Sequence, residues 1–204
     1  MKRFEEDFKD KLVGLDFDTI ENFPHTIYGL SKELKLNYFN SAWLEFATMN
    51  NGEPDISSRF PIGTPIEKAL AGGIKDFYID NYSRVLRDLR IWNHEYECSS
   101  ASIYRLFYQN VYPLKNGDGI IIVNGIRIEK PFDEDFRPTS KHPISEYLDA
   151  NGFIAQCSNC RKTQRVSDLK FWDWVPAFVK KMPENVSHSI CPICYDYYWK
   201  FANV

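Results

Sequence analysis

Residues 92–126 read WNHEYECSSASIYRLFYQNVYPLKNGDGIIIVNGI and carry the clearest fold signal in the chain. Three runs within it, 92–99, 103–114 and 120–126, are rich in the aromatic and β-branched residues that favour strands. The segment 116–119, NGDG, is a turn signal between the second and third runs. We therefore predict three consecutive strands in this part of the chain.

The residues before these strands predict two more strands and then helices. Residues 26–30 and 35–39 are short β-like runs separated by a hairpin-length turn, and a helix over 42–49 follows, capped at Asn40. A longer helix is predicted over 75–90. Its apolar face consists of Phe77, Ile79, Tyr82, Val85, Leu86 and Leu89. Five strands with the helices segregated in the middle predict an α+β fold, with one five-stranded antiparallel sheet and helices on one face.

Between these two helices, the sequence predicts a loop and then a short helix. Residues 50–63 are rich in Asn, Gly, Pro and Ser and predict a loop. Thr64 is predicted to cap a short helix that ends at Gly72 and Gly73, because a proline follows it and Glu67 stands three residues later.

An amphipathic helix is predicted over residues 3–13, within an N-terminal segment that spans 1–19. Phe4, Phe8 and Leu12 recur at helical spacing, which places them on one stripe. That stripe could pack on the chain's own domain or on a partner in a dimer. The sequence leaves both alternatives open.

Four of the five cysteines form two CxxC motifs, at 157–160 and 191–194. Two residues between cysteines let both thiolates reach one ion, and two such motifs complete a tetrahedral four-sulfur shell, for which zinc is the default metal. The 30 residues between the motifs must then fold back on themselves. Two disulfides or a redox-active dithiol are the alternatives, but the thioredoxin-like βαβ context of a redox CxxC is missing. The predicted ligands of a structural zinc ion are Cys157, Cys160, Cys191 and Cys194.

The composition fits one ordinary domain followed by a small module. Of the 204 residues, 44% are hydrophobic and 16% aromatic, which is enough for a folded core. The net charge of −3 is too small to imply a nucleic-acid or membrane partner by itself, and it is uneven: +3 from residue 151 onward and −6 before it. We predict a sheet domain over 20–128, a proline- and charge-rich linker over 129–150, and the cysteine module over 151–204.

The sequence indicates a soluble, cytoplasmic protein with no membrane partner. Its N-terminus turns acidic at residues 5–7 and lacks the apolar run of a signal peptide. No stretch approaches the ~20 apolar residues of a transmembrane helix. Paired thiols without a secretion signal point to a reducing cytoplasm, which also favours a metal site over disulfides.

Residues 20–128 resemble a PAS domain. The stretch 30–43, LSKELKLNYFNSAW, is similar to the opening of that family, in which a strand, a turn and a second strand end in an asparagine that caps the next helix. Residues 94–100, 105–107 and 111–114 resemble the last three strands of bacterial PAS sensors. The resemblance implies a sensor with a pocket between sheet and helices, which in this family can hold haem, a flavin, a chromophore or a small metabolite.

The C-terminal segment resembles a short cysteine module found at the ends of bacterial sensory proteins. In that module a CxxC followed by basic residues leads to a tryptophan-bearing helix and a SHxxCPxC ending. The matching segments here are 157–162, Trp172 to Met182, and 187–194. This resemblance implies a sensory or signalling role and does not reveal a molecular activity.

The ligand of the PAS-like segment cannot be named from its residues. A haem pocket needs an axial histidine, often on the long helix, but 75–90 has none, and His25 and His94 are isolated. A photoreactive flavin site needs a cysteine in an Asn-Cys-Arg-Phe context. The NCR of residues 159–161 lies outside the PAS-like segment, in a predicted metal motif.

Two other side chains have competing interpretations. His188 stands three residues before Cys191 and could compete as a ligand, although beside four thiolates such a histidine more often only supports them. Cys98 is more often a small buried apolar residue than a redox sensor. Because no phosphate-binding glycine loop, nucleophile elbow or HExxH motif occurs, we expect no enzymatic activity and assign no catalytic residue.

We therefore predict a PAS sensor that detects a small ligand or cue and relays it through protein contacts, as a homodimer or with a signalling partner. The alternative is a transcription-type regulator, because a zinc module rich in basic and aromatic residues could bind nucleic acid. The basic residues are Arg161, Lys162, Arg165, Lys180 and Lys181. A switch that releases zinc on oxidation is a third possibility. The apolar side chains of the module more naturally form its core: Phe171, Trp174, Val175, Phe178 and Met182.

Overall fold

The computed structural model describes residues 2–200, which form two compact units. The first unit contains the described residues up to Leu70, together with Tyr78–Glu95 and Tyr108–Ile126. The second contains Ala71–Phe77, Tyr96–Phe107 and the described residues from Arg127 onward. The second unit thus includes strand ends of the main sheet as well as the cysteine module. The domain boundaries proposed from the sequence stay a prediction.

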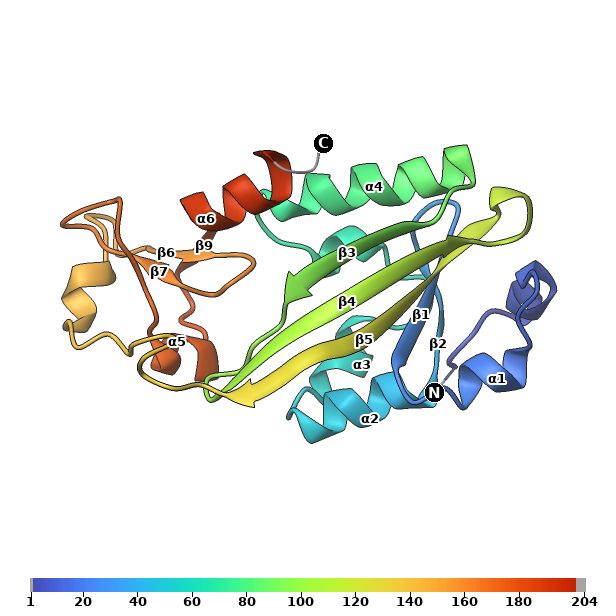
Figure 1. The fold of residues 1–204 in the computed structure, drawn as a ribbon, viewed down its shortest axis with the longest axis horizontal. Helices are drawn as coiled ribbons and strands as arrows, with labels where there is room; N and C mark the ends of the chain where they lie inside the picture. The colour runs from blue at the N-terminus through green and yellow to red at the C-terminus, as the bar shows by residue number, and fades with distance from the viewer. Residues whose placement is uncertain (1, 201–204) are drawn as a thin grey trace. The chain divides into compact units, whose positions relative to one another are not determined.

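A five-stranded antiparallel sheet has the strand order β2-β1-β5-β4-β3 (Figure 1). Its strands are β1 (Thr26–Ser31), β2 (Leu36–Phe39), β3 (Trp92–Glu97), β4 (Ile103–Pro113) and β5 (Gly119–Pro131). The last strand pairs with the first, and Tyr28 lies opposite Ile122. The tight turn into β5 requires glycine at 119, because a Cβ there would lie 2.4 Å from the carbonyl oxygen of Leu30. The predicted α+β class and the five-stranded sheet are confirmed.

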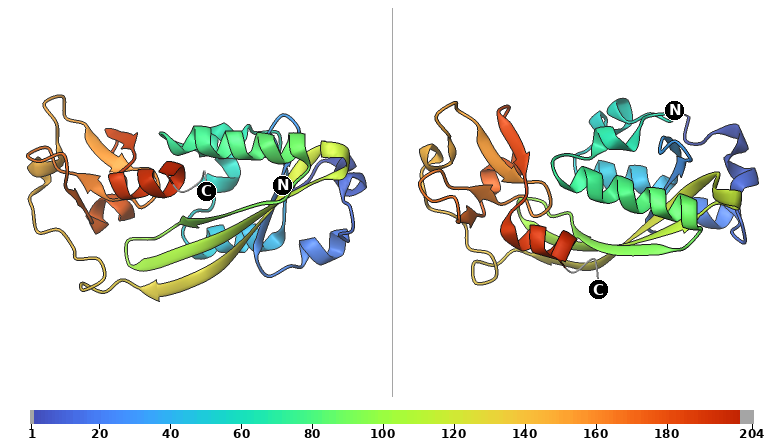
Figure 2. Two further views of the ribbon diagram at one scale, coloured as in Figure 1. Left: turned by 45° about the horizontal axis from the view of Figure 1, so that its top comes forward. Right: turned by 90° about the horizontal axis from the view of Figure 1, so that it is seen from above.

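The helices that follow β2 lie on one side of this sheet (Figure 2). They are α2 (Ser41–Met49), α3 (Asp55–Arg59), a 3-10 helix (Ile66–Ala69) and α4 (Ile74–Asp88). The loop predicted over 50–63 is wrong where α3 forms. The predicted cap at Thr64 is also wrong: its backbone is tied to the β2 strand, since Leu36 N–H donates to the Thr64 carbonyl, and the helix is confined to one turn.

The long helix ends one residue earlier than its apolar pattern suggests. Leu89 has a φ of 52°, in the left-handed region, so the helix stops at Asp88. Its side chain is 53% exposed, and its predicted place on the buried helix face is wrong. Tyr82 and Val85, in contrast, are buried as predicted.

Asn40 is the hydrogen-bonding centre of the first unit. Its side-chain oxygen accepts from Trp43 N–H at 3.1 Å, which caps α2 as predicted, and from Ile27 N–H at 2.9 Å in β1. Its amide NH₂ donates to three backbone carbonyls, including that of His25 at 2.9 Å. A fully buried amide with every group bonded fixes the start of α2 against the sheet.

The N-terminal segment covers the sheet face opposite the helices. It forms a 3-10 helix (Glu6–Lys11) and α1 (Phe17–Glu21), so the helix predicted over 3–13 is wrong in extent. Residues 3–5 are extended because they pair with β2 through Phe39 N–H and Glu5 N–H. Phe8 is fully buried and stacks on Tyr38 at 4.4 Å, which confirms the alternative that this stripe packs on its own domain.

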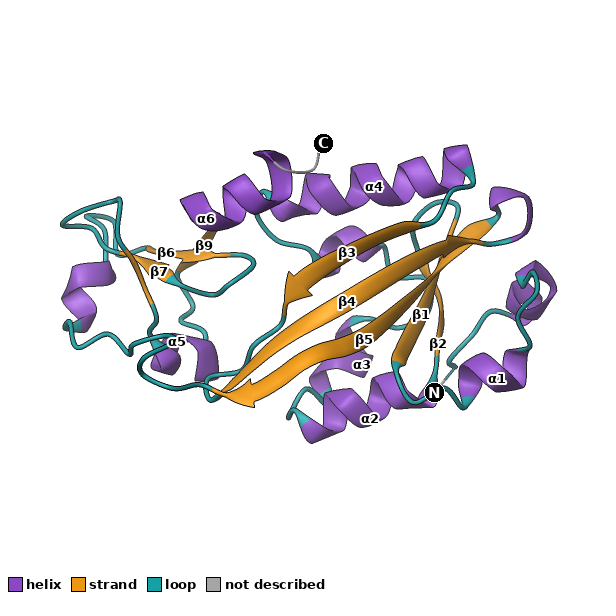
Figure 3. Cartoon of the chain, viewed as in Figure 1, coloured by secondary structure: helices purple, strands orange, loops and turns teal. Residues whose placement is uncertain are grey.

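The cysteine module is built on a second sheet, of order β8-β7-β6-β9 (Figure 3). Its elements are a 3-10 helix (Ile144–Tyr147), β6 (Ile154–Cys157), β7 (Thr163–Gln164), β8 (Trp172–Asp173), α5 (Pro176–Lys180), β9 (Val186–Ser189), α6 (Pro192–Tyr195) and a π-helical turn (Asp196–Lys200). The predicted tryptophan-bearing helix starts only at Pro176, because Trp172 and Asp173 pair with β7 instead.

The core of the module is only partly the predicted one. Trp174 and Phe178 are buried and Val175 packs against the core, as expected. Phe171 and Met182 are 52% and 49% exposed, so their predicted core role is wrong. Part of the core comes instead from the segment predicted as a linker, where the Tyr147 side chain is buried against Ile154 and Phe178. β5 also continues into this segment as far as Pro131, with its last residues exposed.

None of the helices among residues 2–200 combines the length and apolarity needed to cross a lipid bilayer.

Candidate functional site

The second unit brings the four predicted metal ligands together. The sulfurs of Cys157, Cys160, Cys191 and Cys194 lie within 4.8 Å of one another, and all four residues are buried. The Cys160 and Cys191 sulfurs are 3.7 Å apart, far longer than a disulfide bond. A tetrahedron with the 2.3 Å arms of a zinc–thiolate site has edges of about 3.8 Å. Four buried cysteines in this arrangement could hold a metal ion.

Backbone geometry places these thiols. Cys157 is the last residue of β6, and a turn follows it in which Arg161 N–H donates to the Cys157 carbonyl at 3.1 Å. Cys191 immediately precedes Pro192, the first residue of α6. Parallel pairing of β6 with β9 then brings the second motif to the first. The 30-residue insert therefore does fold back, as the spacing requires.

The thiols strongly perturb one another. The pKa of Cys157 is far below its usual range, because the thiols of Cys160, Cys191 and Cys194 donate to its sulfur, and Cys191 N–H adds a bond at 3.4 Å. The pKa of Cys160 is far above its usual range, because its thiol shares hydrogen bonds with the sulfurs of Cys157, Cys191 and Cys194, and because ionising it would add a second negative charge beside Cys157. Four thiolates can share this space only with a cation between them.

Asn159, inside the first motif, supports the sulfurs from outside. Its amide nitrogen donates to the Cys194 sulfur at 3.2 Å, and Tyr198 O–H donates to its side-chain oxygen at 2.9 Å. Tyr198 is buried and contacts Phe77 edge-to-face at 4.7 Å. Sequence reasoning missed this role, although an amide between two ligand cysteines is a detectable signal.

Arg137 anchors the module within the second unit and lies in the segment predicted as a linker. Its guanidinium donates two parallel hydrogen bonds to Glu97 at the end of β3, at 2.7 and 2.9 Å, and the two side chains are each 10% exposed. The guanidinium also lies 5.0 Å from the Trp174 ring and 5.1 Å from the Phe132 ring. A third, longer contact of 3.4 Å reaches the Cys160 carbonyl. One buried side chain thus joins the ends of β3 and β5 to the first cysteine motif.

The remaining predicted candidates have different outcomes. Among the described residues the metal-ligand cluster contains the four cysteines and not His188, which is exposed on β9. Cys98 is exposed, so its predicted buried apolar role is wrong. Of the basic residues, Arg165 donates to the Asp173 carboxylate at 2.9 Å, which balances its positive charge.

A chain of buried hydrogen bonds crosses the interior of the first unit. Tyr82 O–H donates to the Gln109 side-chain oxygen at 3.2 Å, and the Gln109 amide donates to Asn124 at 3.0 Å. Tyr82 has therefore used its proton, so Tyr28 O–H donates to Tyr82 over their 3.0 Å contact. Burial raises the pKa of Tyr28 to about 12, against the opposing effect of these bonds.

These residues come from three strands and a helix. Gln109 and Asn124 occupy inward positions of β4 and β5, alternating with outward side chains such as Ile121, which packs under the N-terminal segment. Gln109 and Asn124 are 3% and 4% exposed. Sequence reasoning missed both, although an amide at an inward strand position breaks the expected apolar pattern.

His94 lies in the same unit against two aromatic rings. It stacks on Trp92 at 5.5 Å and meets Tyr78 edge-to-face at 5.9 Å. Burial lowers its pKa to about 4, so it is neutral near pH 7.

The neutral state of His94 should make stability depend on pH. Its pKa is about 4 when folded and about 6.5 when unfolded, so the unfolded chain binds the extra proton between these values and stability falls as the pH drops from 6.5 towards 4. The native chain should lose about 2 kcal/mol more of its free energy of unfolding over this pH range than the variant His94→Gln. Urea denaturation at pH 4.5, 5.5, 6.5 and 7.5 measures it. Asn93→Gln, at an exposed and non-titrating position beside His94 on β3, should leave the slope unchanged, and an equal slope in both variants would contradict the assignment.

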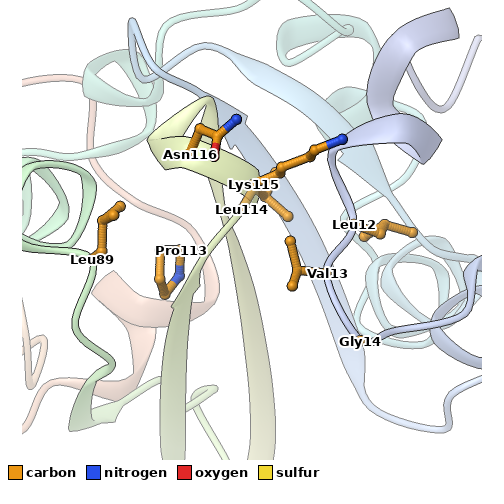
Figure 4. Close-up of a pocket in the computed structure, with 8 residues that line it drawn as sticks. All are labelled: Leu12, Val13, Gly14, Leu89, Pro113, Leu114, Lys115 and Asn116. Atoms are coloured by element: carbon orange, nitrogen blue, oxygen red, sulfur yellow. The ribbon is translucent and has the colours of Figure 1, made fainter.

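A separate hollow of about 630 Å³ opens between the N-terminal segment and the β4–β5 turn (Figure 4). Of its eight lining residues only Lys115 is charged. The others are mostly apolar, including Leu12, Val13 and Leu89. It offers no cluster of titratable or ligating groups.

Comparisons with known proteins add a limited structural likeness. A scan against models of protein families gave no match, and a search of curated proteins gave none either. Part of the chain is similar to the crystal structure of the phage VqmA–DPO complex, at 16% identity and a TM-score of 0.40, over 53% of this chain and 50% of that one. Another similar structure is the PAS domain of Bordetella pertussis BvgS, at 19% identity and a TM-score of 0.40, over 55% and 84% of the two chains. The chain thus spans half the length of the VqmA chain that it matches.

Proposed function

We propose that this chain is a PAS-type sensor that binds a small polar ligand in its sheet domain and relays its state through protein contacts. The observation that carries the proposal is the buried chain of hydrogen bonds through Tyr82, Gln109 and Asn124. A purely structural interior is more stable when it is apolar, because buried polar groups add little net stability even when bonded. Ligand pockets, in contrast, combine apolar walls with a few placed polar groups.

The cysteine module has a structural part in this proposal. Cys157, Cys160, Cys191 and Cys194 hold one zinc ion, which stabilises a module whose apolar core is small. Zinc is the natural ion for four thiolates and contributes no reaction here. We propose no catalytic step. We propose that the protein is located in the cytoplasm and that its partner is a second copy of the chain or a signalling protein.

A matched pair of variants tests the sensor proposal. Native mass spectrometry of the purified chain, compared with its denatured mass and with elemental analysis, should reveal one zinc ion and the additional mass of a small molecule. Gln109→Leu should lose the small-molecule mass and keep the zinc. Asn110→Leu, the next residue on β4 with its side chain on the other face, should keep both.

The sensor proposal fails if two results are found together. The native chain carries no extra mass, and a small-molecule extract of the expressing cells does not raise its melting temperature. A ligand retained by Gln109→Leu at full occupancy would show that it binds elsewhere. A nucleic-acid shift that weakens steeply with salt would instead support the transcription-type alternative.

A further inference from the structure

One face of the module sheet carries an unusual row of polar side chains. Gln156 on β6 is paired in register with Thr163 on β7 and with His188 on β9, so these three side chains lie side by side. Asp173 on β8 continues the row beyond Thr163. Cys157, the next residue after Gln156, faces the opposite side, so this row is separate from the metal ligands.

Two members of this row are buried, and each has one side-chain donor without a hydrogen-bond partner among the described residues. Gln156 and Thr163 are both fully buried, and neither the Gln156 amide nitrogen nor the Thr163 hydroxyl has a hydrogen-bond partner among the described residues. The Gln156 side-chain oxygen accepts from Arg161 Nε at 3.2 Å. This bond fixes the amide so that its NH₂ end is the unpartnered one. Each such group costs stability unless a bound species satisfies it.

The charge beside these groups is positive and unbalanced. Three other arginines of this unit have a carboxylate partner: Arg105 with Glu129, Arg137 with Glu97 and Arg165 with Asp173. Arg161 has none among the described residues, and its charge reaches His188, whose pKa it helps to lower together with burial. The Asp173 carboxylate is already occupied by Arg165 and by Tyr147 O–H at 2.9 Å.

We propose that Gln156, Thr163 and Arg161 form a binding site for a small oxyanion, separate from the cysteine cluster. The amide NH₂, the hydroxyl and the free N–H groups of Arg161 are hydrogen-bond donors, and the unbalanced guanidinium selects negative charge over a neutral molecule. His188, the third paired member of the row, is exposed on β9. Nothing in this proposal depends on the sensor function.

Thr163→Val tests the site because it removes one donor without changing the side-chain shape. The zinc-loaded chain is melted in Tris chloride and then with added inorganic phosphate or sulfate at matched ionic strength. For the native chain we expect a saturable rise in melting temperature of about 5 °C at 100 times the dissociation constant. Thr163→Val should melt at or above the native temperature in chloride and lose the saturable rise.

Two further variants keep the test independent of folding. Arg161→Gln should raise the half-saturating phosphate concentration at least about tenfold, since a charge-assisted bond is lost. Thr48→Val replaces an exposed threonine on α2 in the first unit and should respond to phosphate as the native chain does. Zinc content is measured throughout, to exclude an effect of phosphate on the metal.

The proposal is overturned by either of two results. If neither phosphate nor sulfate gives a saturable shift, the two buried donors are satisfied by water alone. If Thr163→Val is strongly destabilised in chloride, its hydroxyl has a partner within the protein and the basis of the site is wrong. Neither result affects the mass-spectrometric test of the sensor.

Discussion

Replacing Cys157 with serine should release the metal ion and unfold the cysteine module while the first unit stays folded. Each of the four sulfurs lies within 4.8 Å of the other three, and the Cys157 sulfur also accepts from the Cys191 N–H at 3.4 Å, so its loss removes one of four ligands and a backbone contact. Binding free energies of structural zinc sites are about 10–16 kcal/mol, comparable to the whole stability of a small module. We expect zinc to fall from one equivalent per chain to a small fraction of that.

Elemental analysis and hydrogen exchange together measure this outcome. Amides of β6 and β9 should lose protection, whereas those of β1 and β5 should keep it, because their cores contain no cysteine. Cys98→Ser is the matched control, since Cys98 is exposed and outside the cluster. Full zinc content and an unchanged melting curve in Cys157→Ser would mean that these cysteines hold no metal.

Arg137→Met should be the most destabilising change outside the cysteines. It leaves the Glu97 carboxylate buried with no opposite charge, and breaking one side of a buried ion pair costs about 3–5 kcal/mol. It also removes the cation from the Trp174 and Phe132 rings. We expect the second unit to lose about 3 kcal/mol, measured by urea denaturation with hydrogen exchange to locate the loss.

A double variant separates the ion pair from simple packing. Arg137→Met combined with Glu97→Met buries no unpaired charge, so much of the stability should return. Arg87→Met, which breaks the exposed Arg87–Asp88 pair, should cost little. If the double variant were as unstable as the sum of its two single variants, Arg137 would act through packing and not through Glu97.

Sequence patterns predicted the structure correctly where the signal lies within a few neighbouring residues. The β-rich run over 92–126, the cap at Asn40 and the paired CxxC spacing each depend on a few neighbouring residues, and the structure has all three features. The errors arose where long-range pairing overrides local preference. Thr64 has the sequence of a helix cap, but its carbonyl accepts a bond from β2, and residues 3–5 extend because they pair with the same strand.

The α+β class, the five strands and the four clustered cysteines could be predicted, because periodicity and motif spacing are properties of neighbouring residues. Which distant side chains meet is seen only in the folded chain. Arg137 reaches Glu97 across 40 positions, and Gln109 reaches Asn124 across 15. The buried row of Gln156 and Thr163 depends likewise on strand register. Burial and register are set by the folded chain as a whole, and no local pattern records them.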